Sequence, residues 1–473
     1  MAVRRAADRE VVARQLGRDP TTQFEVVARC AEPDGVSAHP LIIRNHPVDA
    51  DGKPFPTLFW LTCPEASKAV SRLESTGEIG RLNGRFDEDP DFRARVERAH
   101  AEYARERGRA HEPALEWGGV GGTRTGVKCL HAHYANHLAG GDDVVGELVA
   151  RQVEPVHPGQ PGEPVAAVDV GTNSVRLLVA RASAAEDPPL IDLARDTVIT
   201  RLGQGVDEHG RIDDRALERT LEVLRRFGRQ ARALHAARVR VGATSAVRDA
   251  DNRDDLAKGI EEATGAEMEI VPGEREAGLS FLGSTRGLDR PAPFLVMDIG
   301  GGSTEFVIGQ EDPREAISTQ MGSVRMTERV RPRDPPTEED LRNLAREVDR
   351  VLDDVEERIP VGQARTFVAV AGTATTVQAV ALGLDGYDPD RIHRTAITAE
   401  EAERALHRLA GMSTNERAAL PVMAPGRADV IVAGATILSR ALRRLGFDEA
   451  VVSETDLLDG LALEVLEGAW PGP

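Results

Sequence analysis

Two short stretches of the chain place an aspartate, a glycine turn and small hydroxyl residues between hydrophobic runs. They read VDVGTNSVRLL at residues 168–178 and VMDIGGGSTEF at residues 296–306. Two strands joined by such a turn expose several backbone N–H groups on one side, and glycine lets phosphate oxygens approach the main chain. The aspartate at the strand end lies too close to the turn to bind phosphate directly. It suits Mg²⁺, which prefers carboxylate and phosphate oxygens. The predicted chemistry is phosphate binding assisted by a divalent ion.

The two stretches are copies of one another. Aligned at Asp169 and Asp298, they match without a gap at a constant offset of 129 residues. A third, partial copy, VAVAGTATT at residues 368–376, keeps a glycine and threonines but lacks the aspartate. One glycine turn alone is more often a tight hairpin, whereas two copies in register and a third turn favour a phosphate site. The matched positions are Gly171 with Gly300 and Ser174 with Ser303.

The elements that must position these turns alternate between strand and helix after residue 165, which predicts an α/β fold. An amphipathic helix is expected over residues 215–234. The other expected units are strands at 166–170 and 176–180, a strand and loop at 238–250, a strand, turn and helix at 267–283, a strand, turn and strand at 294–309, and a strand, glycine turn and helix at 366–382.

Composition narrows the class of protein. The 473 residues are 41% hydrophobic and 29% charged, which is typical of a globular chain long enough for two or three domains. No apolar run reaches the length of a membrane span and the N-terminus lacks a signal core, so we expect a cytoplasmic protein. A net charge of −19 argues against nucleic-acid binding. A polyanionic substrate remains compatible with it if metal ions and arginines invert the local field.

A proline-rich stretch, QVEPVHPGQPGEP at residues 152–164, is the best candidate for a domain boundary. Its prolines fall at every third residue, the period of polyproline II, which predicts a semi-rigid extended linker. It separates an N-terminal domain, residues 1–151, from the α/β part.

The N-terminal domain combines short strands with helices. Strands are expected at residues 25–30 and 56–64. A helix is expected over residues 89–109, with Asp89 as its N-cap and Pro90 in its first turn. One face of that helix should be buried, formed by Phe92, Val96, Ala99 and Tyr103.

All three cysteines of the chain lie in this domain. Because their number is odd, they cannot all pair as disulfides. Three histidines lie near Cys129 at positions 131, 133 and 137, and cysteine and histidine are the ligands of structural zinc. The predicted Zn²⁺ ligands are Cys30, Cys63, Cys129 and His133. The spacing fits no standard zinc knuckle, and small buried thiols beside ordinary histidines are the alternative.

Six motifs, in this order, resemble the Ppx/GppA family of exopolyphosphatases and guanosine pentaphosphate phosphatases over residues 165–468. They are VDVGTNSVRLL, GATSAVRDADN, GEREAGLSF, MDIGGGSTEF, MGSVRMTE and AVAGTATT. The resemblance implies two actin-like, sugar-kinase-like (ribonuclease H-like) α/β lobes, at 165–290 and 291–473, with an interlobe cleft and a C-terminal helix that returns to the first lobe. The segment before the linker, expected to be a separate small α+β domain, resembles a bacterial domain family of unknown function through FPTLFWLTCP and GVKCLHAHYA.

The resemblance also implies roles for individual residues. The family hydrolyses a terminal phosphoanhydride of polyphosphate or pppGpp, and its catalytic glutamate falls at Glu276, with Arg248 near the substrate. A carboxylate at that point can orient water for in-line attack. The implied Mg²⁺ ligands are Asp169, Asp298 and Glu305. The residues expected to hold phosphate are Gly171, Thr172, Asn173, Ser174, Gly300, Gly301, Gly302, Ser303, Thr304, Gly372 and Thr373.

Two features depart from the pattern of this family. Gly278 stands where many members carry an arginine, and this sequence ends near Trp470, whereas longer members continue into a C-terminal helical domain. We therefore expect shorter polyphosphate or pppGpp as substrate, and a homodimer is implied by the family. An ATP-dependent kinase of the same fold and a catalytically silent sensor of pppGpp or polyphosphate stay open as alternatives. Acceptor-dependent transfer from ATP would identify the first, and binding without turnover would identify the second.

Overall fold

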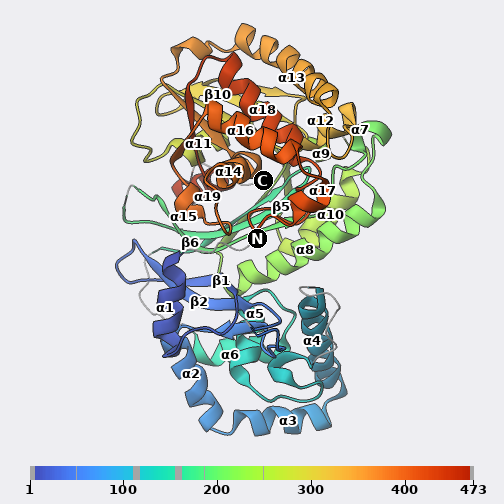
Figure 1. Cartoon of the computed structure of the whole chain (residues 1–473). Coiled ribbons are helices and arrows are strands. Elements are labelled where there is room, and N and C mark those ends of the chain that lie inside the picture. The colour runs from blue at the N-terminus through green and yellow to red at the C-terminus, as the bar shows by residue number, and fades with distance from the viewer. Residues whose placement is uncertain are drawn as a thin grey trace.

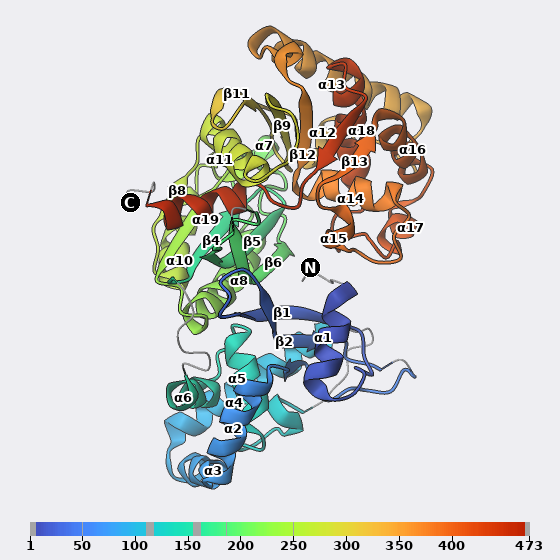
Figure 2. The same cartoon turned by 90° about the vertical axis from the view of Figure 1, so that its left-hand side faces the viewer.

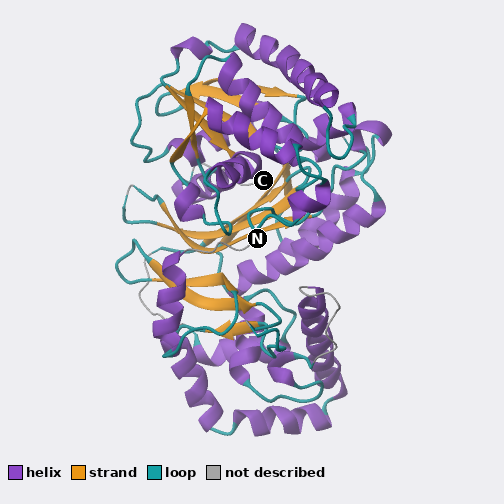
Figure 3. Cartoon of the chain, in the orientation of Figure 1, coloured by secondary structure: helices purple, strands orange, loops and turns teal. Residues whose placement is uncertain are grey.

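The computed structural model describes residues 6–49, 51–109, 118–154, 162–185, 187–248 and 250–468. In these residues the strands form three separate sheets, one in an N-terminal domain and one in each of two α/β lobes (Figures 1 and 3). The predicted α/β lobes and separate N-terminal domain are therefore confirmed. None of the described helices combines the length and apolarity needed to cross a bilayer.

The N-terminal domain packs helices against one antiparallel sheet of order β1-β2-β3. The predicted helix over 89–109 is confirmed, because Asp89 caps it by accepting hydrogen bonds from Asp91 N and Phe92 N at 3.1 and 3.0 Å. Its predicted apolar face is buried. The elements are α1 (Ala6–Leu16), β1 (Phe24–Ala31), β2 (Ala38–Asn45), β3 (Phe59–Leu61), α2 (Pro64–Ser75), α3 (Glu78–Glu88), α4 (Pro90–Arg109), η1 (Val120–Gly122), α5 (Leu130–Leu138) and α6 (Val144–Val153).

A buried carboxylate joins α5 to α6. Asp143 caps α6 through Val145 N and Gly146 N, and it also binds His133 Nδ1 and Asn136 Nδ2, each at 2.9 Å. Burial alone would raise the pKa of the Asp143 carboxyl, but His133 and these hydrogen bonds hold it below its usual value. The folded domain therefore requires this carboxylate to be ionised.

We expect Asp143→Asn to destabilise the N-terminal domain by about 3 kcal/mol, because it removes the charge paired with a buried histidine. In calorimetry of the full chain, the first unfolding transition should fall by about 6 °C or more. Asp142→Asn is the matched control, since the neighbouring side chain is exposed. Equal midpoints for the two variants would contradict this role for Asp143.

Lobe I carries a five-stranded sheet of order β6-β5-β4-β7-β8. Asp213 caps its long helix, accepting from Arg215 N and Ala216 N at 3.0 Å. The elements of lobe I are β4 (Val165–Val170), β5 (Ser174–Ala182), β6 (Leu190–Ile199), α7 (Val206–His209), α8 (Asp214–Ala233), β7 (Arg238–Ala243), α9 (Ser245–Arg248), α10 (Arg253–Thr264) and β8 (Met268–Ile270).

Lobe II repeats this arrangement in a six-stranded sheet of order β11-β10-β9-β12-β14-β13, with one extra antiparallel edge strand. Its strands are β9 (Phe294–Ile299), β10 (Thr304–Gly309), β11 (Pro313–Thr319), β12 (Thr366–Val370), β13 (Thr395–Thr398) and β14 (Glu449–Val452). Its helices are α12 (Ser323–Val330), α13 (Glu338–Arg358), η2 (Val361–Gln363), α14 (Ala371–Ala381), α15 (Pro389–Ile392), α16 (Ala399–Ala410), α17 (Thr414–Ala418) and α18 (Ile431–Arg444).

The two sheets confirm the internal repeat. The first two glycine turns join β4 to β5 and β9 to β10, and in each lobe the first strand lies between the second and fourth. The third turn leads from β12 into helix α14, as expected. Its counterpart in lobe I is the turn between β7 and α9, at the same offset, since Ala243 aligns with Gly372. Both β7 and β12 run parallel to the strand that carries the aspartate.

Two helices connect the lobes. α11 (Gly273–Thr285) packs on β9, β10 and β11 of lobe II, whereas α19 (Leu457–Glu467) packs on β4, β5 and β7 of lobe I (Figure 2). They cross closely at Gly283 and Gly460, where a Cβ on either residue would overlap the backbone of the other helix. The closing helix thus returns to lobe I as expected, while the strand before it, β14, stays in the sheet of lobe II.

The N-terminal domain docks on lobe I. Strand β1 lies along β6, and α5 packs against α8 (Figures 1 and 2). Gln230 Nε2 donates to Val27 O at 3.1 Å, and Arg229 Nε donates to Gly140 O at 2.7 Å. The buried apolar side chains of the two parts form one continuous cluster. Residues 155–161 of the predicted proline-rich linker lie outside the described residues.

Candidate functional site

The first two glycine turns face each other across the junction of the lobes. A Cβ on Gly302 would lie 2.8 Å from both Thr172 Oγ1 and Ser245 Oγ, and one on Gly301 would lie 3.2 Å from Thr172 Cβ. Both turns close in the same way, with Gly171 N bound to Ser174 O at 2.9 Å and the matching bond at 3.0 Å in lobe II. A side chain at either glycine of lobe II would crowd the opposite lobe, which the sequence did not indicate.

A cavity of about 1070 Å³ opens at these turns. The third turn also reaches it, so backbone and hydroxyl groups from both lobes surround one space. Of the residues expected to hold phosphate, those that line the cavity are Gly171, Thr172, Asn173, Ser174, Gly300, Gly301, Gly302, Ser303, Gly372 and Thr373. Thr304 differs, since it is buried within β10 and does not appear among the described lining residues.

Three of the predicted carboxylates also line the cavity. Asp169 and Asp298 lie near the ends of β4 and β9, and Glu276 projects from the first turn of α11. Glu305 is the cross-strand partner of Asp298 and lies buried beside it, where Ser318 Oγ donates to its Oε1 at 2.7 Å. The fold thus gathers all four acids from four elements, β4, α11, β9 and β10.

The acids of lobe II are crowded and poorly solvated. Burial, with Asp456 and Glu305 nearby, raises the pKa of Asp298 to about 8, and burial raises the pKa of Glu305 to about 7. Burial and Glu305 also raise the pKa of Glu276 well above its usual value. A bound divalent cation would favour the ionised forms. Hard carboxylate oxygens beside these glycine turns fit Mg²⁺.

The repeat is asymmetric at the position opposite each aspartate. In lobe II that position holds Glu305, whereas in lobe I it holds Arg176, which lies opposite Asp169. Arg176 donates from Nε to Asp169 at 2.8 Å and also binds Asp456. Because Asp169 already has a cationic partner, Asp298 is the cavity-lining aspartate in greater need of a metal ion.

Arg248 contacts Glu276, the predicted general base. Its Nη1 donates to Glu276 Oε2 at 2.9 Å and to Val271 O at 2.5 Å. Among the described residues that line the cavity, Arg248 does not appear. This arrangement would let Arg248 orient Glu276, and its predicted contact with substrate stays a prediction.

Sequence reasoning missed another, partly buried arginine at the cavity. Arg427 lies over the third glycine turn, where a Cβ on Gly372 would overlap its guanidinium, and its Nη1 donates to Thr376 Oγ1 at 2.7 Å. It lines the same cavity. An arginine there can bind phosphate oxygens. No motif marks it, because 55 residues separate Arg427 from Gly372 in the chain.

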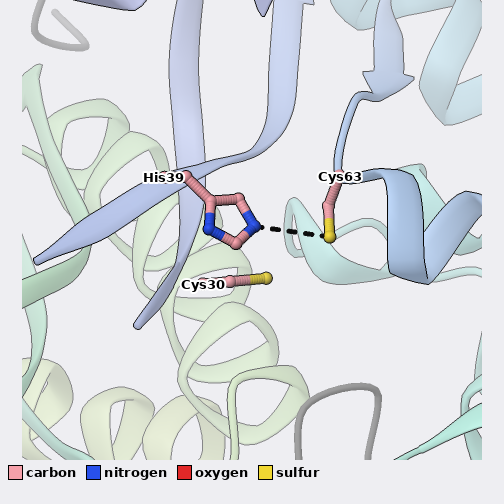
Figure 4. A group of neighbouring side chains, drawn as sticks. All are labelled: Cys30, His39 and Cys63. Atoms are coloured by element: carbon pink, nitrogen blue, oxygen red, sulfur yellow. Dashed lines mark hydrogen bonds between the residues drawn. The ribbon is translucent and has the colours of Figure 1, made fainter. Parts of the chain in front are cut away.

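The predicted zinc ligands do not come together as a set of four. Cys30 and Cys63 meet His39, which the sequence analysis did not select (Figure 4). Cys129 instead groups with Glu74 and His131, and His133 is held by Asp143. The prediction of Cys129 and His133 in one site with Cys30 was wrong, because α5 directs these side chains to partners of their own.

Comparisons with known proteins agree with the two-part organisation. Residues 178–468 match the model of the Ppx/GppA phosphatase family, and residues 27–151 match DUF501, a protein family of unknown function. Exopolyphosphatase 2 of Mycobacterium tuberculosis is 43% identical over 312 residues, which cover 64% of this chain and 98% of that protein. Exopolyphosphatase 1 of the same organism is 31% identical over 311 residues, with 64% and 89% covered.

Solved structures resemble the same part of the chain. An exopolyphosphatase-like protein superposes with a TM-score of 0.61 at 37% identity, covering 65% of this chain and all of that one. The Ppx/GppA family member of Aquifex aeolicus gives a TM-score of 0.56 at 30% identity, covering 65% of this chain and 99% of that one.

Proposed function

Because this chain belongs to the Ppx/GppA phosphatase family over residues 178–468, we propose that it releases terminal phosphate from inorganic polyphosphate by Mg²⁺-assisted hydrolysis. The observation that carries the proposal is the convergence of Glu276, Asp298 and the facing glycine turns on one cavity. Relatives that bear the name exopolyphosphatase and cover the same residues support it. The triphosphate end of pppGpp carries the same terminal bond and is the second substrate that we propose.

Glu276 fits the role of the base that orients and deprotonates the attacking water. It lies at the cavity wall, and Arg248 fixes its orientation through the 2.9 Å hydrogen bond to Oε2. Its raised pKa makes the carboxylate a better proton acceptor near neutral pH than an exposed glutamate. In a reaction with a largely dissociative transition state, catalysis rests on such positioning and on charge stabilisation.

The groups around Glu276 suit the remaining requirements of phosphoryl transfer to water. The turns at Gly171 and Gly300 and the hydroxyls beside them would hold the phosphoryl oxygens, and Arg427 would add positive charge at the third turn. Asp298, with Glu305 beside it and Asp169 across the cleft, would hold Mg²⁺. When bound, that ion would neutralise phosphate charge and polarise the bond that breaks.

Phosphate release measured on a panel of substrates tests the proposal. Polyphosphates of defined length, pppGpp and ATP are supplied with Mg²⁺ and, in parallel, with excess chelator. We expect orthophosphate from polyphosphate only when Mg²⁺ is present. Release that needs an acceptor and starts from ATP would instead identify a kinase, and binding of polyphosphate or pppGpp without release would identify a sensor.

A further inference from the structure

We infer that Cys30, His39 and Cys63 form a Zn²⁺ site in the N-terminal domain (Figure 4). The family that matches this domain has no known function. The two Sγ atoms and one ring nitrogen lie within 4.8 Å of one another. Cysteine thiolates with a histidine are a common donor set for zinc in proteins.

The pairing of the sheet brings these three residues together. Cys30 near the end of β1 is the Cα partner of His39 near the start of β2. Cys63 follows β3 and is the N-cap of α2, and its N–H donates to Leu41 O at 3.4 Å, beside His39. Each ligand therefore comes from a different strand or strand end of the sheet.

The spacing of the donor atoms fits a tetrahedral ion with little movement. His39 Nε2 lies 3.4 Å from Cys63 Sγ. With Zn–N near 2.05 Å and Zn–S near 2.3 Å, two ligands of a tetrahedral ion lie about 3.6 Å apart. The Sγ of Cys30 is already close to both atoms. An ion between the three donors would replace the weak contact between ring and thiol.

A carboxylate already fixes the orientation of the histidine. Glu32 Oε1 lies 2.5 Å from His39 Nδ1, so that nitrogen carries the proton and Nε2 is the ligand atom. Metal-bound histidines usually have such a carboxylate on the other ring nitrogen. The second grouping, Glu74 with Cys129 and His131, differs, since Glu74 Oε1 accepts the backbone N–H of Leu130 and is used as a helix cap.

Charge and burial also suit a divalent ion. Cys63 is fully buried and Cys30 is 7% exposed. Two thiolates would balance the charge of Zn²⁺, so the loaded site would be close to neutral. With three protein ligands, the fourth position is left for water on the side of His39, whose side chain is 17% exposed.

Metal analysis of the full chain tests the site. Protein purified without chelator, then dialysed, should retain about one Zn²⁺ per chain, and Co²⁺ substituted for Zn²⁺ should show thiolate charge-transfer bands. Cys30→Ser, His39→Ala and Cys63→Ser should each lower zinc affinity at least about tenfold. Cys129→Ser is the matched control and should bind zinc as the wild type does.

Two outcomes would overturn the site. The first is that metal-free wild-type protein binds no Zn²⁺ on titration. This test does not depend on how the variants fold. The other is a loss of zinc in Cys129→Ser equal to that in Cys63→Ser. Zinc content is read without any assay of turnover, so the result stands apart from the proposed phosphatase function.

A separate observation concerns where the rest of a polyphosphate chain would lie, and this inference rests on the proposed function. The cavity at the glycine turns continues past β6 and α8 to the N-terminal domain. We propose that this continuation is a binding track for the polymer behind its terminal phosphate. Arginines from both parts of the protein line it, among them Arg44, Arg105, Arg219, Arg225 and Arg229.

The lining of the track holds more arginines than acidic residues, unlike the chain as a whole. Seven arginines and five acidic residues line the part of the cavity beyond the turns, in a protein with a net charge of −19. Arg219 and Arg229 donate to backbone carbonyls, of Thr200 and Gly140, so these hydrogen bonds leave their charges uncancelled. The two arginines are ten positions apart on α8, which is about 15 Å, the length of several phosphate units.

The dependence of KM on chain length tests the track. Arg219→Gln should raise the ratio of KM for long polyphosphate to KM for tripolyphosphate at least about fivefold, because only the long chain reaches this arginine. Arg232→Gln is the control, since Arg232 is on the same helix and also donates to a carbonyl but does not appear among the described lining residues. An unchanged ratio in Arg219→Gln would overturn the track. Failure of the wild type to hydrolyse polyphosphate of any length would instead refute the proposed function.

Discussion

Replacing Glu276 with glutamine should lower kcat for polyphosphate at least about 100-fold while changing KM less than about threefold. A general base contributes about 10²- to 10⁴-fold to such reactions, and glutamine cannot accept the proton of the attacking water. The amide keeps the size of the side chain, so binding through the turns and the fold itself should survive. Steady-state phosphate release at saturating Mg²⁺ gives both constants.

Glu274→Gln is the control for this variant. Glu274 lies in the same first turn of α11, but its side chain is exposed, whereas Glu276 is 7% exposed and lines the cavity. The control should retain wild-type kcat. Turnover by Glu276→Gln within a few-fold of the control would remove Glu276 from the mechanism and leave the water without an identified base.

Replacing Asp298 with asparagine should lower turnover at least about 100-fold and raise the Mg²⁺ concentration needed for half-maximal rate at least about tenfold. Asparagine supplies a neutral ligand in place of a carboxylate, and Mg²⁺ favours charged oxygens. The concentration of Mg²⁺ is varied at fixed polyphosphate. A variant with wild-type Mg²⁺ dependence would exclude Asp298 as a ligand.

The Asp298→Asn change, which should lower turnover, should make the metal-free protein lose less stability as the pH rises. The folded-state pKa of Asp298, about 8, lies above its value of 3.8 in an unfolded chain. The stability that its protonation contributes is therefore fully present below pH 3.8 and is lost as the pH rises through about 8. An asparagine side chain carries no charge to desolvate, so Asp298→Asn should lose less stability with rising pH than the wild type. The exposed Asp289→Asn is the control.

Local patterns were enough to predict most of the lobes. The two strand–turn–strand copies around Asp169 and Asp298 were predicted from hydrophobic runs and glycines that lie within a dozen residues of each other. The constant offset between matching residues revealed the repeat. The cap at Asp89 and the buried stripe of α4 depend on helical spacing alone. Such features are set by neighbours in the chain, which is why the structure confirms them.

Long-range contacts were not predictable in the same way. Arg176 binds Asp456, 280 residues further along, and the side chain of Arg427 packs on Gly372 from a loop with no recognisable motif. His39 joins Cys30 and Cys63 only because strand pairing places it there, whereas the local Cys-x-His-x-His pattern suggested His133. These positions are decided by sheet register and by the docking of the lobes.

Hydrolysis in water enriched in ¹⁸O tests the central claim most directly. If the cleft between the turns positions water against a terminal phosphate, each orthophosphate released from polyphosphate with Mg²⁺ should carry one ¹⁸O atom. The chain should shorten by single units, and Glu276→Gln should reduce the labelled product at least about 100-fold. Orthophosphate without ¹⁸O, or labelled product made equally well by Glu276→Gln, would contradict the account.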